Sequence, residues 1–446
     1  MKSFEDLKIH KSQLKALNDL GLENPTPIQI KALPAILSGR DMVGLAQTGT
    51  GKTFAYLLPV LKLIPYSEQI HPRVLILVPT RELVVQVVEA VKSLTTYQNI
   101  RVDGVYGGVN INNQKQAVND GLDILVATPG RLFDLAVSGV LRLSSIQKLI
   151  IDEVDEMLFI GFRPQLLNIL DILPQRRQNI LFSATLTEEV EKIIANFFKS
   201  AIKIEIVPVG TPLEKIIQKG YAIPNYNTKV NFLKVLLKDK SLEKVLIFVK
   251  NKRIADRLYE NLNEEFSEEI NLIHSNKSQN FRFNAIEQFQ NSTHRILVAT
   301  DIVSRGMDIK GVTHVINFDT PELPEQYIHR IGRTGRARKN GMAITLFTEK
   351  EEESILEIEI LMQTEIPLIE LPGDVDISKD LMPEEKDKTV DKEIIRKELK
   401  KEEPGPAFHT KSEKNQKINL GGSYKREIKK KYKKPKTRPP KRKGKK

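Results

Sequence analysis

The sequence predicts an α/β fold built twice in tandem, each time as a doubly wound parallel sheet with helices on both faces. One observation is a series of short, uniformly apolar runs, separated by stretches with helical periodicity. These runs are too short for helices and too apolar for half-exposed strands, so they indicate strands that are covered on both sides. The other observation is that polar clusters directly follow several of the runs, as expected where strands and helices alternate.

The individual elements can be placed along the chain. In the first half, the expected strands are residues 74–78, 124–126, 149–151 and 180–182. In the second half, they are residues 245–249, 296–298, 315–318 and 343–347. Helical patterns lie between them, for example from Glu82 to Leu94 and from Ile254 to Asn261. The two series of strands indicate two related domains.

Proline, glycine and charge mark the domain boundaries. The first domain is expected at residues 1–207, a connector at 208–213 and the second domain at 214–368. Residues 369–420 are expected to form a linker or extension, with a short helix near Lys392 to Lys401. Residues 421–446 carry 14 Lys or Arg and one acid, a net charge of about +13. Because the whole chain has a net charge of +12, the remaining residues together are near −1. This basic tail has no apolar period and is expected to be disordered.

Composition excludes several classes of protein. The 446 residues include no cysteine, which rules out disulfides, thiolate metal sites and cysteine nucleophiles. The start of the chain has no apolar signal-peptide core, and no uncharged apolar run approaches 18 residues. We therefore expect a cytoplasmic protein without a membrane partner. The basic tail favours nucleic acid as a partner, although a solubilising tail would have the same composition.

Two segments predict a site for a nucleoside triphosphate and Mg²⁺. Ala46-Gln-Thr-Gly-Thr-Gly-Lys-Thr53 is a glycine-rich loop before a helix. Lys52 would reach the β- and γ-phosphates, and the hydroxyl of Thr53 would bind Mg²⁺. After the apolar run 149–151, Asp152 would hold Mg²⁺ through water and Glu153 would orient or deprotonate the attacking water. The residues expected around the phosphates are Thr48, Gly49, Thr50, Gly51, Lys52 and Thr53.

A pair of arginines is a candidate for the transition state of hydrolysis. Arg330 and Arg333 are three residues apart in a helical pattern, so they are expected to share one face. Two guanidinium groups in this arrangement could grip a γ-phosphate and stabilise the charge of the transition state. A solvated basic helix would show the same spacing.

In their order along the chain, these segments resemble those of the DEAD-box RNA helicases, an ATP-dependent RNA-remodelling family with two RecA-like domains. The resemblance extends from Phe4 to about Thr348. The matching blocks are Gly21 to Gln29, Ala46 to Thr53, Pro79 to Leu83, Gly107-Gly108, Thr128 to Arg131, Asp152 to Asp155, Ser183 to Thr185, Gln279 with Arg282, Thr300-Asp301, Ser304 to Asp308 and His329 to Arg336. The resemblance implies two RecA-like domains, ATP and Mg²⁺ as cofactors, and RNA as the partner.

The resemblance also implies roles at the nucleotide. Phe4 would stack on adenine and the amide of Gln29 would pair with it, which favours ATP over GTP. Asp308 would touch the nucleotide from the second domain. Without the resemblance, Phe4 reads as a core anchor and Gln29 as a helix-cap residue.

Further residues are implied in coupling and in RNA binding. Ser183, Thr185 and His329 would link hydrolysis to RNA binding, and Asp301 with Arg305 would link the two domains. The residues expected to contact RNA are Pro79, Thr80, Arg81, Gly107, Gly108, Thr128, Pro129, Gly130, Arg131, Gln279, Arg282, Thr300 and Asp301.

One residue departs from the family pattern. The family name stands for Asp-Glu-Ala-Asp, and this chain has Val154 in the third place. Two extra methyl groups can cost about 1–3 kcal/mol if they overpack a core. A β-branched side chain suits a strand, so we expect Val154 to be accommodated there and to affect rate and coupling more than activity.

The expected function is that of an RNA-dependent ATPase and RNA helicase. It would bind single-stranded RNA by phosphate and sugar, without sequence preference, and would locally open short duplexes or remodel RNA–protein complexes. Ribosomal precursors and RNA-degradation complexes both fit as partners. Two alternatives stay open: an ATP-gated RNA clamp with little unwinding, and an RNA chaperone driven by the basic tail. A DNA translocase is disfavoured because the blocks are of the RNA type.

Overall fold

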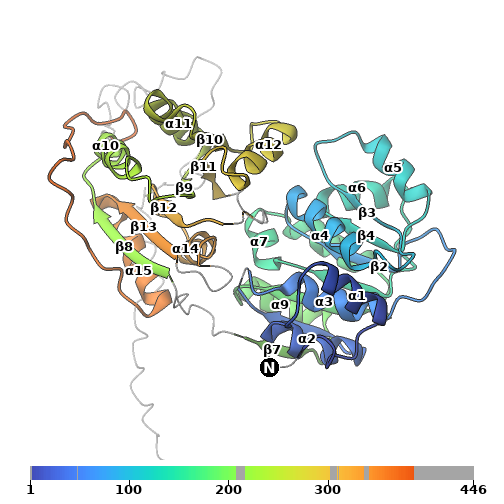
Figure 1. Ribbon diagram of the computed structural model, residues 1–446. Helices are drawn as coiled ribbons and strands as arrows, with labels where there is room; N and C mark the ends of the chain where they lie inside the picture. The colour runs from blue at the N-terminus through green and yellow to red at the C-terminus, as the bar shows by residue number, and fades with distance from the viewer. Residues whose placement is uncertain are drawn as a thin grey trace, which may run out of the picture. The chain divides into compact units, whose positions relative to one another are not determined.

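The computed structural model describes residues 3–47, 49–206, 216–301, 309, 311–335 and 341–385. These residues form two separate sheets, each with its own helices (Figure 1). Every pair of neighbouring strands in both sheets is parallel. The predicted parallel α/β fold is therefore confirmed. The predicted connector, the helix near Lys392 and the basic tail lie outside the described residues.

The first sheet has seven strands, and its strand order brings the predicted motifs together. The strands are β1 (Met42–Leu45), β2 (Val74–Leu77), β3 (Val102–Val105), β4 (Ile124–Ala127), β5 (Lys148–Ile151), β6 (Gln178–Ser183) and β7 (Ile202–Glu205). Their order is β3-β4-β2-β5-β6-β1-β7. Because the strands are parallel, the segments after β1, β6, β5, β2 and β4 are neighbours at one edge of the sheet.

The second sheet has six strands and the same parallel construction. They are β8 (Ile216–Ala222), β9 (Val245–Val249), β10 (Ile270–Ile273), β11 (Ile296–Thr300), β12 (His314–Asn317) and β13 (Gly341–Phe347). Their order is β10-β11-β9-β12-β13-β8. The segments after β11 and β12 therefore lie on either side of the one that follows β9.

Helices cover both faces of each sheet. The first domain has α1 (Lys11–Asp19), α2 (Pro27–Leu37), α3 (Lys52–Lys62), α4 (Arg81–Leu94), α5 (Ile111–Asn119), α6 (Pro129–Val137), α7 (Val154–Phe159), α8 (Arg163–Ile172) and α9 (Glu188–Phe197). The second has α10 (Tyr226–Leu237), α11 (Lys252–Phe266), α12 (Gln279–Gln290), α14 (Pro324–Ile331), the 3₁₀ helix η1 (Glu349–Glu351) and α15 (Glu352–Met362). No helix in this described part of the chain has both the length and the apolar character needed to cross a membrane.

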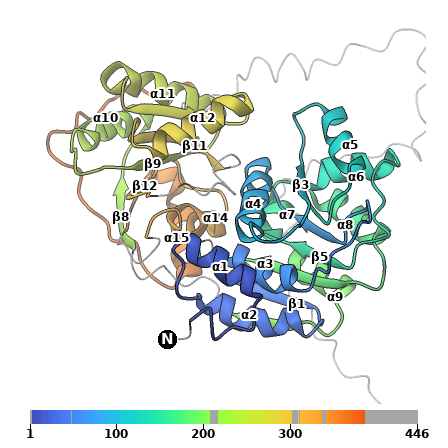
Figure 2. The same cartoon turned by 45° about the vertical axis from the view of Figure 1, so that its right-hand side comes forward.

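The alternation along β2 shows how the first sheet is covered. Val74 and Ile76 belong to one apolar cluster, which includes residues of α1 to α4. Leu75 and Leu77 belong to another, which includes residues of α5 to α9. Figure 2 shows α4 and α5 beside the edge strand β3. Because both faces of the sheet are covered by apolar clusters, the side chains on both sides of a central strand are apolar. Such strands therefore appear in the sequence as uniformly apolar runs.

All eight predicted strands are present, and five further strands were not predicted. Four of these five, β3, β7, β8 and β10, are the edge strands of the two sheets. Edge strands carry more polar residues, so their apolar pattern is weaker. The fifth, β1, is central but contains Gly44, where an added β-carbon would lie 2.5 Å from the ring of Phe182. The glycine is needed for close packing and breaks the apolar run.

The second domain extends beyond residue 368, its predicted end. The backbone of Gly220 in β8 donates to Pro367 O and accepts from Ile369 N, both at 2.8 Å. Farther along, Asn225 Nδ2 donates to Ser378 O at 2.7 Å, and Tyr226 N donates to Glu385 Oε1 at 2.6 Å. Residues up to at least Glu385 therefore belong to this domain. The sequence did not reveal this, because polar groups of α10, rather than an apolar pattern, hold most of the segment.

At the opposite, amino-terminal edge of the first sheet, a buried ion-pair cluster serves stability. Asp123 Oδ1 lies 2.7 Å from Arg73 Nη2, and Asp123 Oδ2 lies 3.2 Å from Arg101 Nε. Burial acts to raise the pKa of Asp123, but hydrogen bonds from Arg101 and Arg73 hold it below its usual range. The carboxylate therefore stabilises the fold above its unfolded pKa of about 3.9, and this contribution is lost as the pH falls through the lower folded pKa.

We expect the substitution Asp123→Asn to destabilise the protein by about 3 kcal/mol at pH 7, because it leaves two guanidinium groups without a carboxylate. Urea unfolding at pH 7 and at pH 3 measures the effect, which should shrink at the lower pH. Asp120→Asn is the control, since Asp120 is exposed and its carboxylate accepts from Gln116 alone among the described residues. An equal loss for both variants, or one that does not change with pH, would contradict the assignment.

Candidate active site and nucleic-acid interface

The glycine-rich loop joins β1 to α3 as a phosphate-binding loop does. Gly49 and Gly51 have φ angles of 80° and 87°, in the left-handed region that favours glycine. Thr50 Oγ1 donates to Gln47 O at 2.8 Å and closes the turn. Helix α3 begins at Lys52, so its free N–H groups face the loop. The Lys52 side chain is buried, and its Nζ makes no hydrogen bond to any described residue.

The predicted carboxylates lie beside this loop, at the end of β5. Asp152 and Glu153 are both buried, and Glu153 has φ 54°, ψ 51°, a left-handed conformation that is costly for this residue type. Asp152 Oδ1 and Glu153 Oε2 form no hydrogen bond within the described residues. Burial raises the pKa of both carboxyl groups, while the Lys52 ammonium acts to lower them. A cation and two acids thus share a buried space without satisfying one another.

This donor set fits Mg²⁺ brought in by a nucleotide. Mg²⁺ takes one or two protein oxygens and completes its shell with phosphate oxygens and water. The free oxygen of Asp152 and the hydroxyl of Thr53 at the start of α3 are donors of this kind. Across the described ranges, no group of three or more His, Cys, Asp or Glu side chains could hold a metal. Phosphate oxygens would therefore have to complete the site.

Asp155 ties the carboxylate segment to the segment after β6. Its Oδ2 accepts from Ala184 N at 3.1 Å and from both Thr185 N and Thr185 Oγ1 at 2.9 Å. Ser183 Oγ donates to Thr185 O at 2.7 Å. Two predicted coupling residues, Ser183 and Thr185, therefore lie in one network that is built on Asp155, which the site prediction did not include.

The third predicted coupling residue, His329 of α14, contacts the same network. Its Nε2 lies 3.9 Å from Asp155 Oδ2, and its Nδ1 contacts the carboxylate of Glu156. The structure thus places His329 with the residues that the sequence associated with it. The coupling role itself stays a prediction.

The two predicted arginine fingers have different surroundings. Arg330 is 2% exposed and binds Asp301 through two hydrogen bonds, of 2.6 Å and 2.7 Å, while its Nη1 donates to Asp319 O at 2.6 Å. Its guanidinium group is therefore occupied by protein groups. Arg333 is also buried, and its charge acts to lower the pKa of Glu153, which burial raises.

The expectation that both arginines share a helical face is wrong for this structure. Helix α14 ends at Ile331, so Arg333 lies beyond it and the three-residue spacing does not apply. Arg333 is the arginine whose charge acts on Glu153, and Arg330 holds Asp301 within the second domain. A role of Arg330 at the phosphate stays untested.

The predicted adenine-binding residues are both buried. Phe4 belongs to the apolar cluster of the first domain, as a core anchor would. Gln29 Oε1 accepts from Thr26 N at 2.9 Å, and its Nε2 donates to Gly51 O at 3.2 Å. A β-carbon at Gly51 would lie 2.7 Å from Gln29 Nε2. Gln29 is thus joined to the phosphate loop, and its contact with adenine stays a prediction.

Three segments predicted to contact RNA meet at the carboxyl edge of the first sheet. A β-carbon added at Gly108, where φ is 84°, would lie 2.0 Å from Arg81 Nη1, so the guanidinium group lies directly against this glycine. Arg131 Nη2 donates to Val109 O at 3.0 Å. Thr80 caps α4 by accepting from Leu83 N. The other predicted contacts beyond the ends of β2, β3 and β4 are Pro79, Gly107, Thr128, Pro129 and Gly130.

The predicted RNA contacts of the second domain are bound to protein groups in this structure. Gln279 Nε2 donates to Glu82 Oε1 at 2.8 Å, and Arg282 forms a buried ion pair with the same carboxylate. Asp301 binds Arg330, and Thr300 is buried at the end of β11. The structure therefore gives no evidence that Gln279, Arg282, Thr300 and Asp301 bind RNA, and this role stays a prediction. Thr48, Arg305 and Asp308 lie outside the described residues.

Val154 is accommodated, but for a different reason than expected. Strand β5 ends at Ile151 and Val154 begins α7, so it does not occupy a strand position. Its side chain is fully buried in the apolar cluster that contains Leu45 and Ile151. The two extra methyl groups therefore fill space in a core.

Glu82 and Asp155 are the main residues that the site prediction missed. Each is an acid inside a quoted block, so a signal was present. Their partners lie 200 residues away for Glu82 and 30 residues away for Asp155. No spacing rule relates such positions, which meet only in the folded chain.

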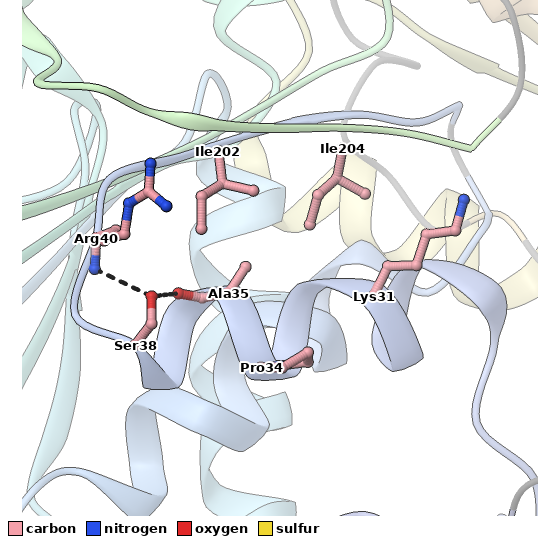
Figure 3. A pocket seen from close by; sticks show the side chains of 7 residues that line it. All are labelled: Lys31, Pro34, Ala35, Ser38, Arg40, Ile202 and Ile204. Atoms are coloured by element: carbon pink, nitrogen blue, oxygen red, sulfur yellow. Dashed lines mark hydrogen bonds between the residues drawn. The ribbon is translucent and has the colours of Figure 1, made fainter.

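The pocket in Figure 3 is separate from these residues. It lies between α2 and the edge strand β7, with Lys31 and Arg40 at its ends. Its lining residues are Lys31, Pro34, Ala35, Ser38, Arg40, Ile202 and Ile204. None of them belongs to the predicted site, and the lining is mostly apolar. The candidate nucleotide site lies elsewhere, around Lys52, Asp152 and Glu153.

Two known families of protein domains match the two halves of the folded chain. The family described as DEAD/DEAH box helicase matches residues 26–193, and the Helicase conserved C-terminal domain matches residues 228–338. The chain is 37% identical over 370 residues to the DEAD-box ATP-dependent RNA helicase RhpA of Helicobacter pylori, covering 83% of this chain and 74% of that protein. It is 38% identical over 362 residues to CshA of Geobacillus kaustophilus, covering 80% and 76%.

Solved structures show the same architecture. S. cerevisiae Dbp5 bound to RNA and ADP BeF3 is similar with a TM-score of 0.76 and 30% identity, covering 83% of this chain and 96% of that one. Mss116 bound to ssRNA and UDP-BeF is similar with a TM-score of 0.77 and 27% identity, covering 84% and 81%. The two parallel sheets are thus RecA-like domains. From the matched domains, the relatives and the motifs at the sheet edge together, this chain belongs to the DEAD-box ATP-dependent RNA helicase family.

Proposed function

We propose that the protein couples ATP hydrolysis to RNA binding and to local opening of RNA duplexes. The observation that carries the proposal is a group of buried charges in which Lys52 Nζ, Asp152 Oδ1 and Glu153 Oε2 have no hydrogen-bond partner among the described residues. Burying such charges without partners is costly, and a triphosphate with Mg²⁺ would satisfy them. Asp152 to Asp155 would then serve as the family's Asp-Glu-Ala-Asp motif, with Val in the third place.

Each residue has a chemical task in this proposal. Lys52 and the N–H groups at the start of α3 would hold the phosphates. Thr53 and Asp152 would hold Mg²⁺, which supplies positive charge to the phosphate oxygens when bound. Glu153 would orient the attacking water and accept its proton, and Arg333 would stabilise the charge that develops on the γ-phosphate. Gln29 would select adenine.

RNA would bind at the carboxyl edge of the first sheet, where Arg81, Gly108 and Arg131 lie together. Dbp5 and Mss116 have been solved with RNA, and single-stranded RNA in the case of Mss116. Contacts to phosphate and sugar carry no base information, so we expect binding that does not depend on sequence. Contacts to 2′-hydroxyls would favour RNA over DNA. We propose the cytoplasm as the compartment, because ATP and RNA meet there, and ribosomal precursors or RNA-degradation complexes as substrates.

A strand-displacement assay tests the proposal against the clamp alternative. The full chain is mixed with a short RNA duplex and ATP, and release of the labelled strand is followed. Release with ATP, and none with the Glu153→Gln variant, supports local unwinding. ATP-dependent retention on RNA without release would favour the clamp. Release without ATP, which disappears when residues 421–446 are deleted, would favour the tail-driven chaperone.

We expect the basic tail to strengthen RNA binding in a salt-dependent way. Residues 421–446 carry 14 Lys or Arg. If about five of these cations meet single-stranded phosphates, the log–log salt slope of binding should be about 3.5 units steeper than for a chain ending at residue 420. RNA affinity measured between low and moderate salt gives both slopes. Equal slopes would exclude an anchoring role, and ATP hydrolysis at saturating RNA should be the same for both chains.

A further inference from the structure

We propose that Gln114 is a positioning residue for RNA binding, because it holds Arg131 and the loop from Tyr106 to Val109 in one arrangement. It lies in none of the sequence blocks that resemble the family motifs. Since its role concerns the RNA-binding edge of the first sheet, it rests on the proposed function.

The side chain of Gln114 lies between two segments and bonds to both. It projects from α5 and is 8% exposed. Its Nε2 donates to Tyr106 O at 3.2 Å, and its Oε1 accepts from Arg131 Nη1 at 2.6 Å. The amide thus uses its donor on the loop after β3 and its acceptor on the first turn of α6. An apolar side chain of similar size could make neither bond.

These bonds close a ring around the two glycines. Arg131 also donates from Nη2 to Val109 O at 3.0 Å. The loop is therefore held at Tyr106 by Gln114 and at Val109 by Arg131. Between these points lie Gly107 and Gly108, and glycine has the widest choice of backbone conformations. Fixing both ends restricts that choice.

The conformation of Gly107 and Gly108 also determines where the side chain of Arg81 can lie. Because Gly108 has no side chain, the Arg81 guanidinium lies against it, in space that a β-carbon would fill. Arg81, Gly108 and Arg131 come from three different segments of the chain, after β2, β3 and β4. Phosphates that follow one another along a strand are bound by groups at matching spacings, and prior ordering of these groups lowers the cost of binding. Gln114 would supply that order without touching RNA.

A role in stability alone is the alternative, and the structure offers a matched control. Helix α5 buries only Gln114 and Val118, so loss of the amide could loosen the helix. Gln116 lies on the same helix and is exposed, and in the described part of the chain its side chain donates only to Asp120, at 2.9 Å. Gln114→Leu and Gln116→Leu thus make the same chemical change at a linked and an unlinked position.

The test compares RNA-dependent ATP hydrolysis by the full chain and by these two variants, with a single-stranded oligouridylate as the RNA. We expect Gln114→Leu to raise the RNA concentration for half-maximal activity about tenfold. This is the change in affinity that corresponds to the loss of about one hydrogen bond to a charged group. Turnover at saturating RNA and the KM for ATP should stay within about twofold, which is the scale of weak surface effects. Gln116→Leu should match the parent protein.

A second variant separates the two bonds. In Gln114→Glu the carboxylate still accepts from Arg131 but cannot donate to Tyr106 O, so we expect a smaller rise in the RNA requirement than for Gln114→Leu. Equal RNA requirements for all variants, or equal losses in RNA affinity, turnover and ATP affinity, would overturn the positioning role. A lowered melting temperature without a changed RNA requirement would also overturn it.

Amide hydrogen exchange decides the matter independently of RNA. Exchange at Gly107 to Val109 should be faster in Gln114→Leu than in Gln116→Leu, and unchanged exchange would overturn the positioning role. If the parent protein showed no RNA stimulation, the proposed function would fail. The exchange result would then still show whether Gln114 orders the loop.

Discussion

Glu153→Gln is expected to lower the turnover of RNA-stimulated ATP hydrolysis at least about a hundredfold, since a general base contributes about 10²–10⁴-fold. The amide has the same size as the carboxylate but cannot accept the proton of the attacking water. Lys52 and Asp152, which we assign to phosphate and Mg²⁺, are unchanged. ATP binding should therefore persist. Turnover at saturating RNA and binding of a fluorescent ATP analogue measure the two quantities.

The control for this change is Glu191→Gln, which removes an exposed acid from the first turn of α9. Its turnover should equal that of the parent protein. If Glu153→Gln retained full turnover, another group would have to activate the water, and the assignment of Glu153 would be withdrawn. If it lost ATP binding, Glu153 would act in binding and not in the chemical step.

Arg333→Ala should lower turnover about a thousandfold, the scale of an arginine finger in phosphoryl transfer. Arg333 is buried, and its positive charge acts to lower the pKa of Glu153, the residue that we assign to the attacking water. Arg333→Lys keeps the charge but loses the planar fork, and should recover only part of the rate. Single-turnover hydrolysis at saturating ATP and RNA separates this effect from ATP binding.

Arg330→Met provides the contrast. It removes a buried guanidinium group that binds the Asp301 carboxylate through two hydrogen bonds, so we expect a loss of stability of about 3 kcal/mol, visible as a lower melting temperature. Turnover per folded molecule should fall much less than for Arg333→Ala. If instead Arg330→Met melted like the parent protein and lost a thousandfold in turnover, Arg330 would contact the phosphate, as its spacing from Arg333 first indicated.

The central strands other than β1, and the phosphate loop, could be predicted because their signals are local. A strand buried on both faces must be apolar throughout, and β2, β4 and β9 show this within four or five residues. The backbone at Gly49 and Gly51 has left-handed φ angles, and glycine in the sequence indicates such positions. The edge strands could not be predicted in this way, because they carry more polar residues and have a weaker apolar pattern. The segment up to Glu385 could not be predicted either, because hydrogen bonds with residues at the start of α10 hold it.

By itself, the sequence determined the two parallel sheets, the order of the motifs at their carboxyl edges, and the acids and cation that a nucleotide would satisfy. Those features depend on residues close together in the chain. Only the tertiary structure decided that Arg330 holds Asp301 while Arg333 acts on Glu153, and that Asp155 anchors Thr185. It also placed Gln114 between Tyr106 and Arg131. The packing of strands and helices against one another determines which polar side chains come within hydrogen-bonding distance. The sequence offers several similar polar side chains for each contact, so it does not by itself identify the pair.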